Sequence, residues 1–155
     1  MSSRAATFET LRVQGVPAAL TANLSYAVPV GRALFAAIFL VAGLTHFTAG
    51  SIGYASQAGV PFASILVPFS GVMALAGGLS VLLGYRARLG AALLVAFLVP
   101  VTVTMHAFWA VSDPMMAQLE QAMFMKNFAI IGGALLIAYF GAGPISLDAR
   151  RGARA

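Results

Sequence analysis

Apolar residues dominate four long stretches of the chain, and short polar or glycine-containing segments separate them. The apolar stretches cover about residues 30–48, 61–85, 89–111 and 121–140. Each approaches the roughly 20 residues that an α-helix needs to cross the hydrocarbon core of a bilayer. The runs also lack the period-2 alternation of a membrane β-barrel strand. The pattern therefore predicts an all-α protein, an integral membrane four-helix bundle.

The composition agrees with this class. The 155 residues are 61% hydrophobic and only 8% charged, whereas a soluble domain usually carries about 25% charged residues. The chain has no cysteine, which excludes disulfides, thiolate-ligated iron–sulfur clusters and cysteine redox chemistry. We therefore predict one membrane domain over residues 30–148, an N-terminal cytoplasmic tail over 1–29 with a short helix around residues 8–13, and a basic C-terminal tail over 149–155.

The basic residues indicate the orientation of the helices. All nine except Lys126 lie before or at the start of the first apolar stretch, between the second and third, or after the fourth: Arg4, Arg12, Arg32, Arg86, Arg88, Arg150, Arg151 and Arg154. Because basic residues concentrate in cytoplasmic segments, this pattern predicts that both termini are cytoplasmic. The arginines form no stripe with interleaved aromatic residues, so we expect no nucleic-acid partner.

This orientation brings polar residues together near the outer leaflet. Ionisable residues at membrane depth are costly and usually face the bundle interior or a wet cavity. Small residues on the same helical stripes, Gly43 for His46 and Gly133 for Lys126, favour inward orientations of both side chains. We predict a ligand-binding site formed by His46, His106, Lys126, Asn127 and Trp109, with Asp113, Glu120 and Thr102 as secondary candidates.

Each of these residues also has a purely structural explanation. A lysine near a helix start can extend to the headgroups, a histidine at a helix end can bond a loop carbonyl, and Trp109 fits an interfacial aromatic. The sequence contains no nucleophile–base pair, phosphate-binding glycine loop or paired carboxylates within a span. No self-contained catalytic constellation is therefore visible, and whether the protein is an enzyme stays open.

The residue types bear on the ligand. Helical His-x-x-x-His or Glu-x-x-His spacings are absent, which disfavours a metal site. Haem is also disfavoured, because the two histidines follow their preceding arginines at unequal distances. A quinone head group fits better, since it needs one or two donors, an aromatic neighbour and an apolar cleft open to lipid.

Three segments resemble DoxX-family membrane proteins. They are GRALFAAIFLVAGLTHF, GGLSVLLGYRARLGAALLVAFLVPVTVTMHAFW and FMKNFAIIGGALLIAYFGAGPISLD. The resemblance implies a four-helix protein of the bacterial inner membrane and a link to membrane oxidoreductase complexes, some of which use quinone. Lys126 and Asn127 match the family pattern. A glutamate that many members carry three residues before the first Gly-Gly pair is replaced here by Ala74.

The leading functional prediction is an accessory, quinone-interacting subunit of a membrane redox system. The alternative is a non-catalytic structural or assembly subunit of a larger membrane complex. In both cases we expect contact with the lipid bilayer and with protein partners or further copies of the chain. Small-solute transport is less favoured, because four short helices leave little room for alternating access and no span is broken by midplane charges.

Overall fold

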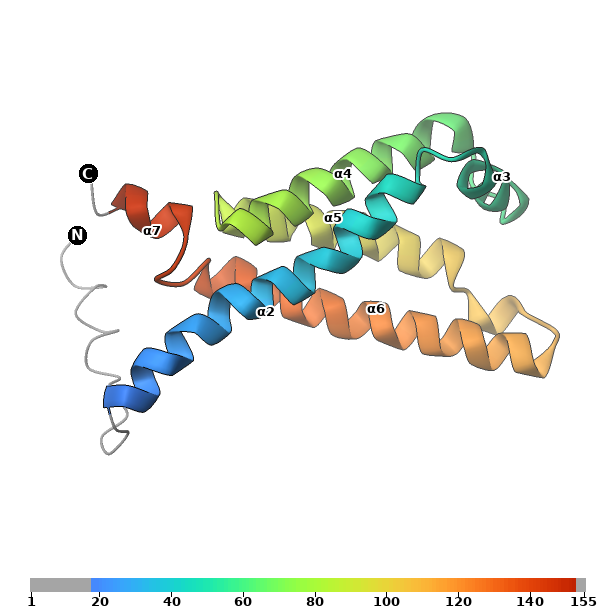
Figure 1. Cartoon of the computed structure of the whole chain (residues 1–155). Helices are drawn as coiled ribbons and strands as arrows, with labels where there is room; N and C mark the ends of the chain where they lie inside the picture. The colour runs from blue at the N-terminus through green and yellow to red at the C-terminus, as the bar shows by residue number, and fades with distance from the viewer. Residues whose placement is uncertain (1–17, 153–155) are drawn as a thin grey trace.

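The computed structural model describes residues 18–152, with side chains described from residue 25 onward. In this part of the chain every regular element is helical (Figure 1). The elements are α2 (Ala18–Thr45), α3 (Ala49–Gln57), α4 (Ala63–Leu83), α5 (Ala87–Met105), the 3-10 helix η1 (Phe108–Ala110), α6 (Pro114–Phe140) and α7 (Leu147–Gly152). The helix predicted around residues 8–13 lies outside the described residues.

Four segments are long and apolar enough to cross a membrane: Ser25–Thr45, Ala63–Leu83, Ala87–Ala110 and Pro114–Phe140. The prediction of an all-α protein with four membrane-spanning helices is confirmed. The direction in which the spans cross the membrane remains a prediction from the arginine pattern.

Two spans belong to longer helices than the hydropathy pattern indicates. Helix α2 already begins at Ala18 and continues through Pro29, rather than starting near residue 30. Helix α6 begins at Pro114, where the Asp113 carboxylate accepts a hydrogen bond from the Met116 N–H at 2.8 Å. Helix α6 thus includes residues before the fourth apolar stretch and continues through it as one helix. Hydropathy locates the segment inside lipid, whereas capping determines where the helix starts.

The polar, glycine-containing connection between the first two spans is itself partly helical. It contains α3, whose N-cap Thr48 accepts a hydrogen bond from the Ser51 N–H at 3.3 Å. Ala55 of α3 packs with Ala63 and Val67 of α4 in a small second core. Threonine is a common N-cap residue, so Thr48 was the sequence signal for this helix.

Helix α4 packs against α2 and α5, and α5 packs against α6. Figure 1 shows α7 and the α4–α5 turn at one end of the bundle, and α3 at the opposite end. We name the first the arginine end, because it carries Arg32, Arg86, Arg88, Arg150 and Arg151. The second is the histidine end, with His46 and His106.

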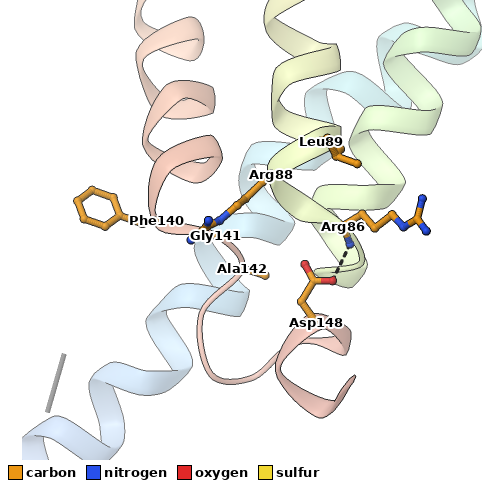
Figure 2. A pocket seen from close by; sticks show the side chains of 7 residues that line it. All are labelled: Arg86, Arg88, Leu89, Phe140, Gly141, Ala142 and Asp148. Carbon is orange, nitrogen blue, oxygen red and sulfur yellow. Dashed lines mark hydrogen bonds between the residues drawn. The ribbon is translucent and has the colours of Figure 1, made fainter. Parts of the chain in front are cut away.

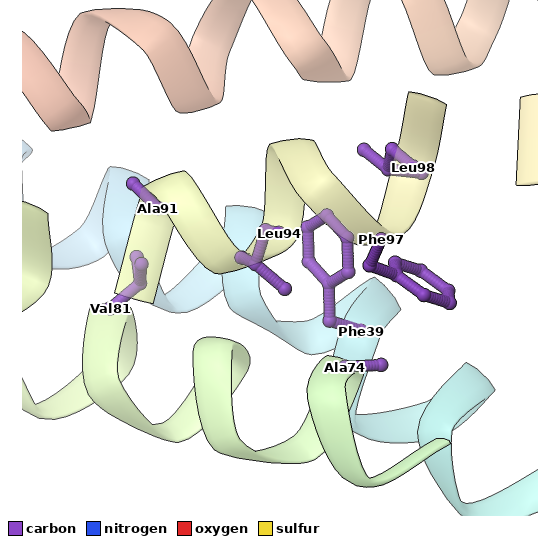
Figure 3. Close-up of a cluster of buried hydrophobic side chains, with 7 residues drawn as sticks. All are labelled: Phe39, Ala74, Val81, Ala91, Leu94, Phe97 and Leu98. Carbon is purple, nitrogen blue, oxygen red and sulfur yellow. The ribbon is translucent and has the colours of Figure 1, made fainter. Parts of the chain in front are cut away.

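The main core lies where α2, α4 and α5 meet (Figure 3). It consists of Phe39, Ala74, Val81, Ala91, Leu94, Phe97 and Leu98. Glycines let the backbones approach closely: a Cβ added to Gly77 of α4 would lie 2.7 Å from the Leu94 side chain of α5. The fully buried Ala74 occupies the position at which the DoxX resemblance implies glutamate.

Candidate functional site

The polar residues of the histidine end separate into two groups. The first surrounds His46, directly after α2. Its Nδ1 lies 2.9 Å from the Ser70 hydroxyl of α4, and its ring centre is 5.8 Å from that of Phe97. The Ser70 hydroxyl donates to the Val67 carbonyl at 2.7 Å. His46 therefore points inward, as predicted, and ties α2 to α4.

The second group centres on a hydrogen-bonded histidine–glutamate pair between the end of α5 and α6. His106 forms the C-cap of α5, and its Nδ1 lies 2.7 Å from Glu120 Oε2. The two side chains are only 20% and 15% exposed. Glu120 orients the imidazole through Nδ1 and leaves Nε2 for another partner. The sequence ranked Glu120 as secondary, whereas the structure gives it a central position.

Asn127 lies two helical turns after Glu120, on the same face of α6. It is 5% exposed, and its side-chain amide forms no hydrogen bond with any residue that the structure describes. Among residues 25–152, the side-chain nitrogen and oxygen atoms that are fully buried without a hydrogen-bond partner are Nε and Nη1 of Arg32, so the Asn127 amide itself keeps contact with the surface of the bundle. The Asn127 amide therefore has hydrogen-bonding capacity that a ligand could use.

Thr102 lies on α5, one turn before His106, and is almost completely buried. Its hydroxyl donates to the Leu98 carbonyl at 2.6 Å. Because this bond uses the only hydroxyl proton, Thr102 can offer a ligand only its acceptor lone pairs.

The prediction that Lys126 points into the bundle is wrong. Its side chain is exposed, and Nζ lies 3.4 Å from the Met123 sulfur on the same helix. Neighbouring residues of an α-helix point about 100° apart, so an inward Asn127 turns Lys126 toward the periphery. Asp113 caps α6 instead of joining the polar groups.

Trp109 is 60% exposed and belongs to η1. Its ring packs edge-on against Phe108 at 5.1 Å and Phe124 at 5.8 Å between ring centres. Phe124 also stacks on Phe128 at 5.4 Å. Trp109 thus opens a run of aromatic rings that continues along α6 beside Asn127.

The structure does not unite all the predicted residues. Among residues 25–152, no hydrogen bond or ion pair joins His46 to His106, or either histidine to Lys126 or Asn127. Nor does this part of the chain bring three or more histidine or acidic side chains together in a group that could hold a metal ion. His106, Glu120 and Asn127 form the remaining candidate site.

The arginine end contains a second polar arrangement that sequence reasoning did not single out. The Asp148 carboxylate accepts hydrogen bonds from the backbone N–H groups of Arg86 and Ala87, at 2.7 and 3.0 Å (Figure 2). Arg32, 5% exposed, donates from Nη2 to the Ile145 carbonyl at 2.7 Å. The segment after α6 is thereby fixed against the α4–α5 turn. Its sequence signal was the closing Gly-x-Gly-Pro-x-Ser-Leu-Asp motif.

The SURF4 family pattern matches residues 11–153, which include all four spans. The chain belongs to the SURF4 family. This SURF4-family protein is 32% identical to inner membrane protein YqjF of Escherichia coli (strain K12), over 78% of its own length and 88% of YqjF. It is 27% identical to inner membrane protein YphA of the same organism, over 78% of its length and 87% of YphA.

No solved structure matches this SURF4-family protein significantly. The relatives and the four spans together establish it as a multi-pass protein of the inner membrane. The comparisons therefore bear out the predicted membrane location.

Proposed function

We propose that this SURF4-family protein is an accessory subunit of a membrane redox system and binds a quinone head group at the histidine end. The proposal rests on one observation: Asn127, whose side chain is mostly buried and whose amide has no hydrogen-bond partner among the described residues, shares a face of α6 with the His106–Glu120 pair. The DoxX resemblance of the same segments, with its link to membrane oxidoreductases, supports this assignment.

The chemistry of the head group fits these partners. A quinone ring carries a carbonyl oxygen on each of two opposite sides, and each oxygen accepts a hydrogen bond. Seven residues of α-helix rise about 10 Å, an axial separation between Glu120 and Asn127 that suits a ring hydrogen-bonded at both of its oxygens. The Asn127 amide would donate to one oxygen, and His106 Nε2 would face the other.

The proposal also explains why the protein would act as an accessory subunit. Reduction of a quinone to a quinol takes two electrons and two protons. The His106–Glu120 pair can exchange a proton at the ring oxygen. The electrons would have to come from a partner subunit that carries a redox centre.

Trp109 offers a direct test, because it is the only tryptophan in the chain and lies in the aromatic run beside the site. The protein in lipid nanodiscs is titrated with a short-chain ubiquinone analogue while tryptophan fluorescence is recorded. We expect saturable quenching, with a Kd at least about tenfold higher for Asn127→Leu, as loss of one buried hydrogen bond predicts. Because the Asn127 amide has no protein partner, this variant should fold normally.

Lys126→Ala provides the matched control, since it changes the adjacent residue whose side chain points away from the site. It should leave the Kd within about twofold of the unmodified protein. Quenching that does not saturate, or that is identical in all three proteins, would contradict quinone binding. That result would favour the structural or assembly subunit, for which Asn127→Leu should alter stability alone.

A further inference from the structure

The α4–α5 turn lies at the edge of the membrane, because one span ends at Leu83 and the next begins at Ala87. Two hollows flank this turn and share Arg86 and Leu89. The first, of about 420 Å³, is lined by Arg86, Arg88, Phe140, Gly141 and Asp148 (Figure 2). The second, of about 430 Å³, continues into the groove between α4 and α5.

The first hollow carries a net positive charge, because two arginines and one aspartate line it. Within residues 25–152, neither Arg86 nor Arg88 has a carboxylate within 4.0 Å. Asp148 also lines this hollow, but both of its oxygens accept backbone N–H groups. Its charge also acts on the buried guanidinium of Arg32. Two exposed guanidinium groups therefore remain to attract an anion.

The backbone at Gly141 makes room for one of them. Gly141 has φ +86, and a Cβ added there would lie 3.2 Å from Arg88 Nε. Figure 2 shows the Arg88 side chain directed toward Gly141 at the end of α6. The Arg88 side chain therefore passes close to Gly141, and both residues line the first hollow.

The surroundings reinforce the positive potential. The Arg151 guanidinium lies 4.5 Å from the centre of the Tyr85 ring. A hydrogen bond from Arg151, and the charges of Arg151 and Arg86, lower the pKa of Tyr85. Arg150 is exposed on α7 and does not line either hollow.

The second hollow is apolar apart from its rim. Ala76, Leu79 and Leu83 of α4 and Gly90 and Leu93 of α5 line it. Leu79 and Leu83 are exposed on the bundle surface, which in this protein faces lipid. A groove of this kind suits an acyl chain.

We propose that the two hollows together bind one anionic phospholipid, with its phosphate at Arg86 and Arg88 and an acyl chain in the α4–α5 groove. Arginine binds phosphate through paired N–H donors, and basic pockets beside membrane helices are a known setting for anionic headgroups. Free phosphate shares this chemistry, but it would leave the adjoining apolar groove empty. The site lies at the opposite end of the bundle from the proposed quinone site and does not depend on it.

Native mass spectrometry from mild detergent tests this proposal with three probes: phosphatidylglycerol, phosphatidylcholine and inorganic phosphate. We expect phosphatidylglycerol to bind with a Kd at least about tenfold lower than that of phosphatidylcholine, and inorganic phosphate not to compete. Arg88→Gln should remove most of this preference, because it deletes one of the two unpaired charges at the hollow. Its exposed position means that the variant should still fold.

Arg150→Gln is the matched control, since it removes the same charge at the same end without touching either hollow. It should keep the preference for phosphatidylglycerol. Ala76→Trp, which fills the groove, should weaken phosphatidylglycerol binding while Arg88 remains in place. Equal binding of the two lipids, competition by inorganic phosphate, or equal effects of Arg88→Gln and Arg150→Gln would each overturn the proposal.

Discussion

One carboxylate, that of Asp148, connects two distant parts of the chain. It accepts two backbone N–H groups at the start of α5, while its own N–H donates to the Gly84 carbonyl at 2.8 Å. Arg86, the N-cap of α5, has φ 48, and a left-handed conformation costs a non-glycine residue about 1–2 kcal/mol. Asp148 thus stabilises a turn that would otherwise be strained.

Removing this carboxylate should have a larger effect than removing an ordinary helix cap. We expect Asp148→Ala to lower the free energy of unfolding by about 2 kcal/mol, because two donors lose a charged acceptor. Asp113→Ala, which removes the single capping bond of α6, should cost about 1 kcal/mol. Denaturant titration in detergent micelles, followed by circular dichroism, measures both. Equal losses would show that the second hydrogen bond of Asp148 contributes nothing.

The sequence located polar residues at the correct end of the bundle but not their directions. His46 points inward as its glycine stripe indicated, whereas Lys126 does not, although Gly133 lies on its stripe. Gly133 faces Phe35 of α2, but α2 and α6 diverge toward the histidine end (Figure 1). The residues along one face of a helix do not show over what length a neighbouring helix packs against that face. The pairing of His106 with Glu120 could not be predicted from the sequence either, because it depends on where α5 ends.

At the scale of the helices, hydropathy identified all four spans, because burial in lipid requires continuous apolar runs. It missed the first part of α2, the early start of α6 and the whole of α3. These segments lie beyond the apolar runs, where capping residues such as Thr48 and Asp113 decide the structure. Gly77, which belongs to the Gly-Gly pair of the second span, lies at a close contact with Leu94 of α5.

The Gly-Gly pairs of α4 (Gly77-Gly78) and α6 (Gly132-Gly133) differ in how closely a neighbouring helix approaches them. Gly77→Leu should lower the free energy of unfolding by about 1–3 kcal/mol, since its Cβ would meet Leu94 at 2.7 Å and overpack the contact of α4 with α5. Gly132→Leu makes the same chemical change on α6, where nothing lies within 4 Å of the added Cβ. It should be neutral or slightly stabilising, because leucine favours helix more than glycine. Thermal unfolding of both variants measures this difference. A loss of stability for Gly132→Leu comparable to that for Gly77→Leu would contradict this packing.

For the whole molecule, charge is distributed along the bundle axis. Within the described residues the arginine end carries five arginines and Asp148. The histidine end has Lys126, opposed by Asp113 and Glu120. This asymmetry, with Arg4, Arg12 and Arg154 of the sequence, is the basis for the predicted orientation, and the positive-inside rule assigns the arginine end to the cytoplasm. The quinone proposal would then concern the outer leaflet and the phospholipid proposal the inner one.

Single-cysteine labelling tests this orientation without background, because the chain has no cysteine of its own. Ser112→Cys places a thiol on the exposed connection before α6, and Gly152→Cys places one at the exposed end of α7. In cells with a permeable outer membrane and an intact inner membrane, a membrane-impermeant maleimide should label Ser112→Cys. Gly152→Cys should react only after the inner membrane is opened. The reverse labelling pattern would show the opposite orientation and assign the quinone site to the cytoplasmic leaflet. Labelling of both variants before the inner membrane is opened would rule out a cytoplasmic C-terminus.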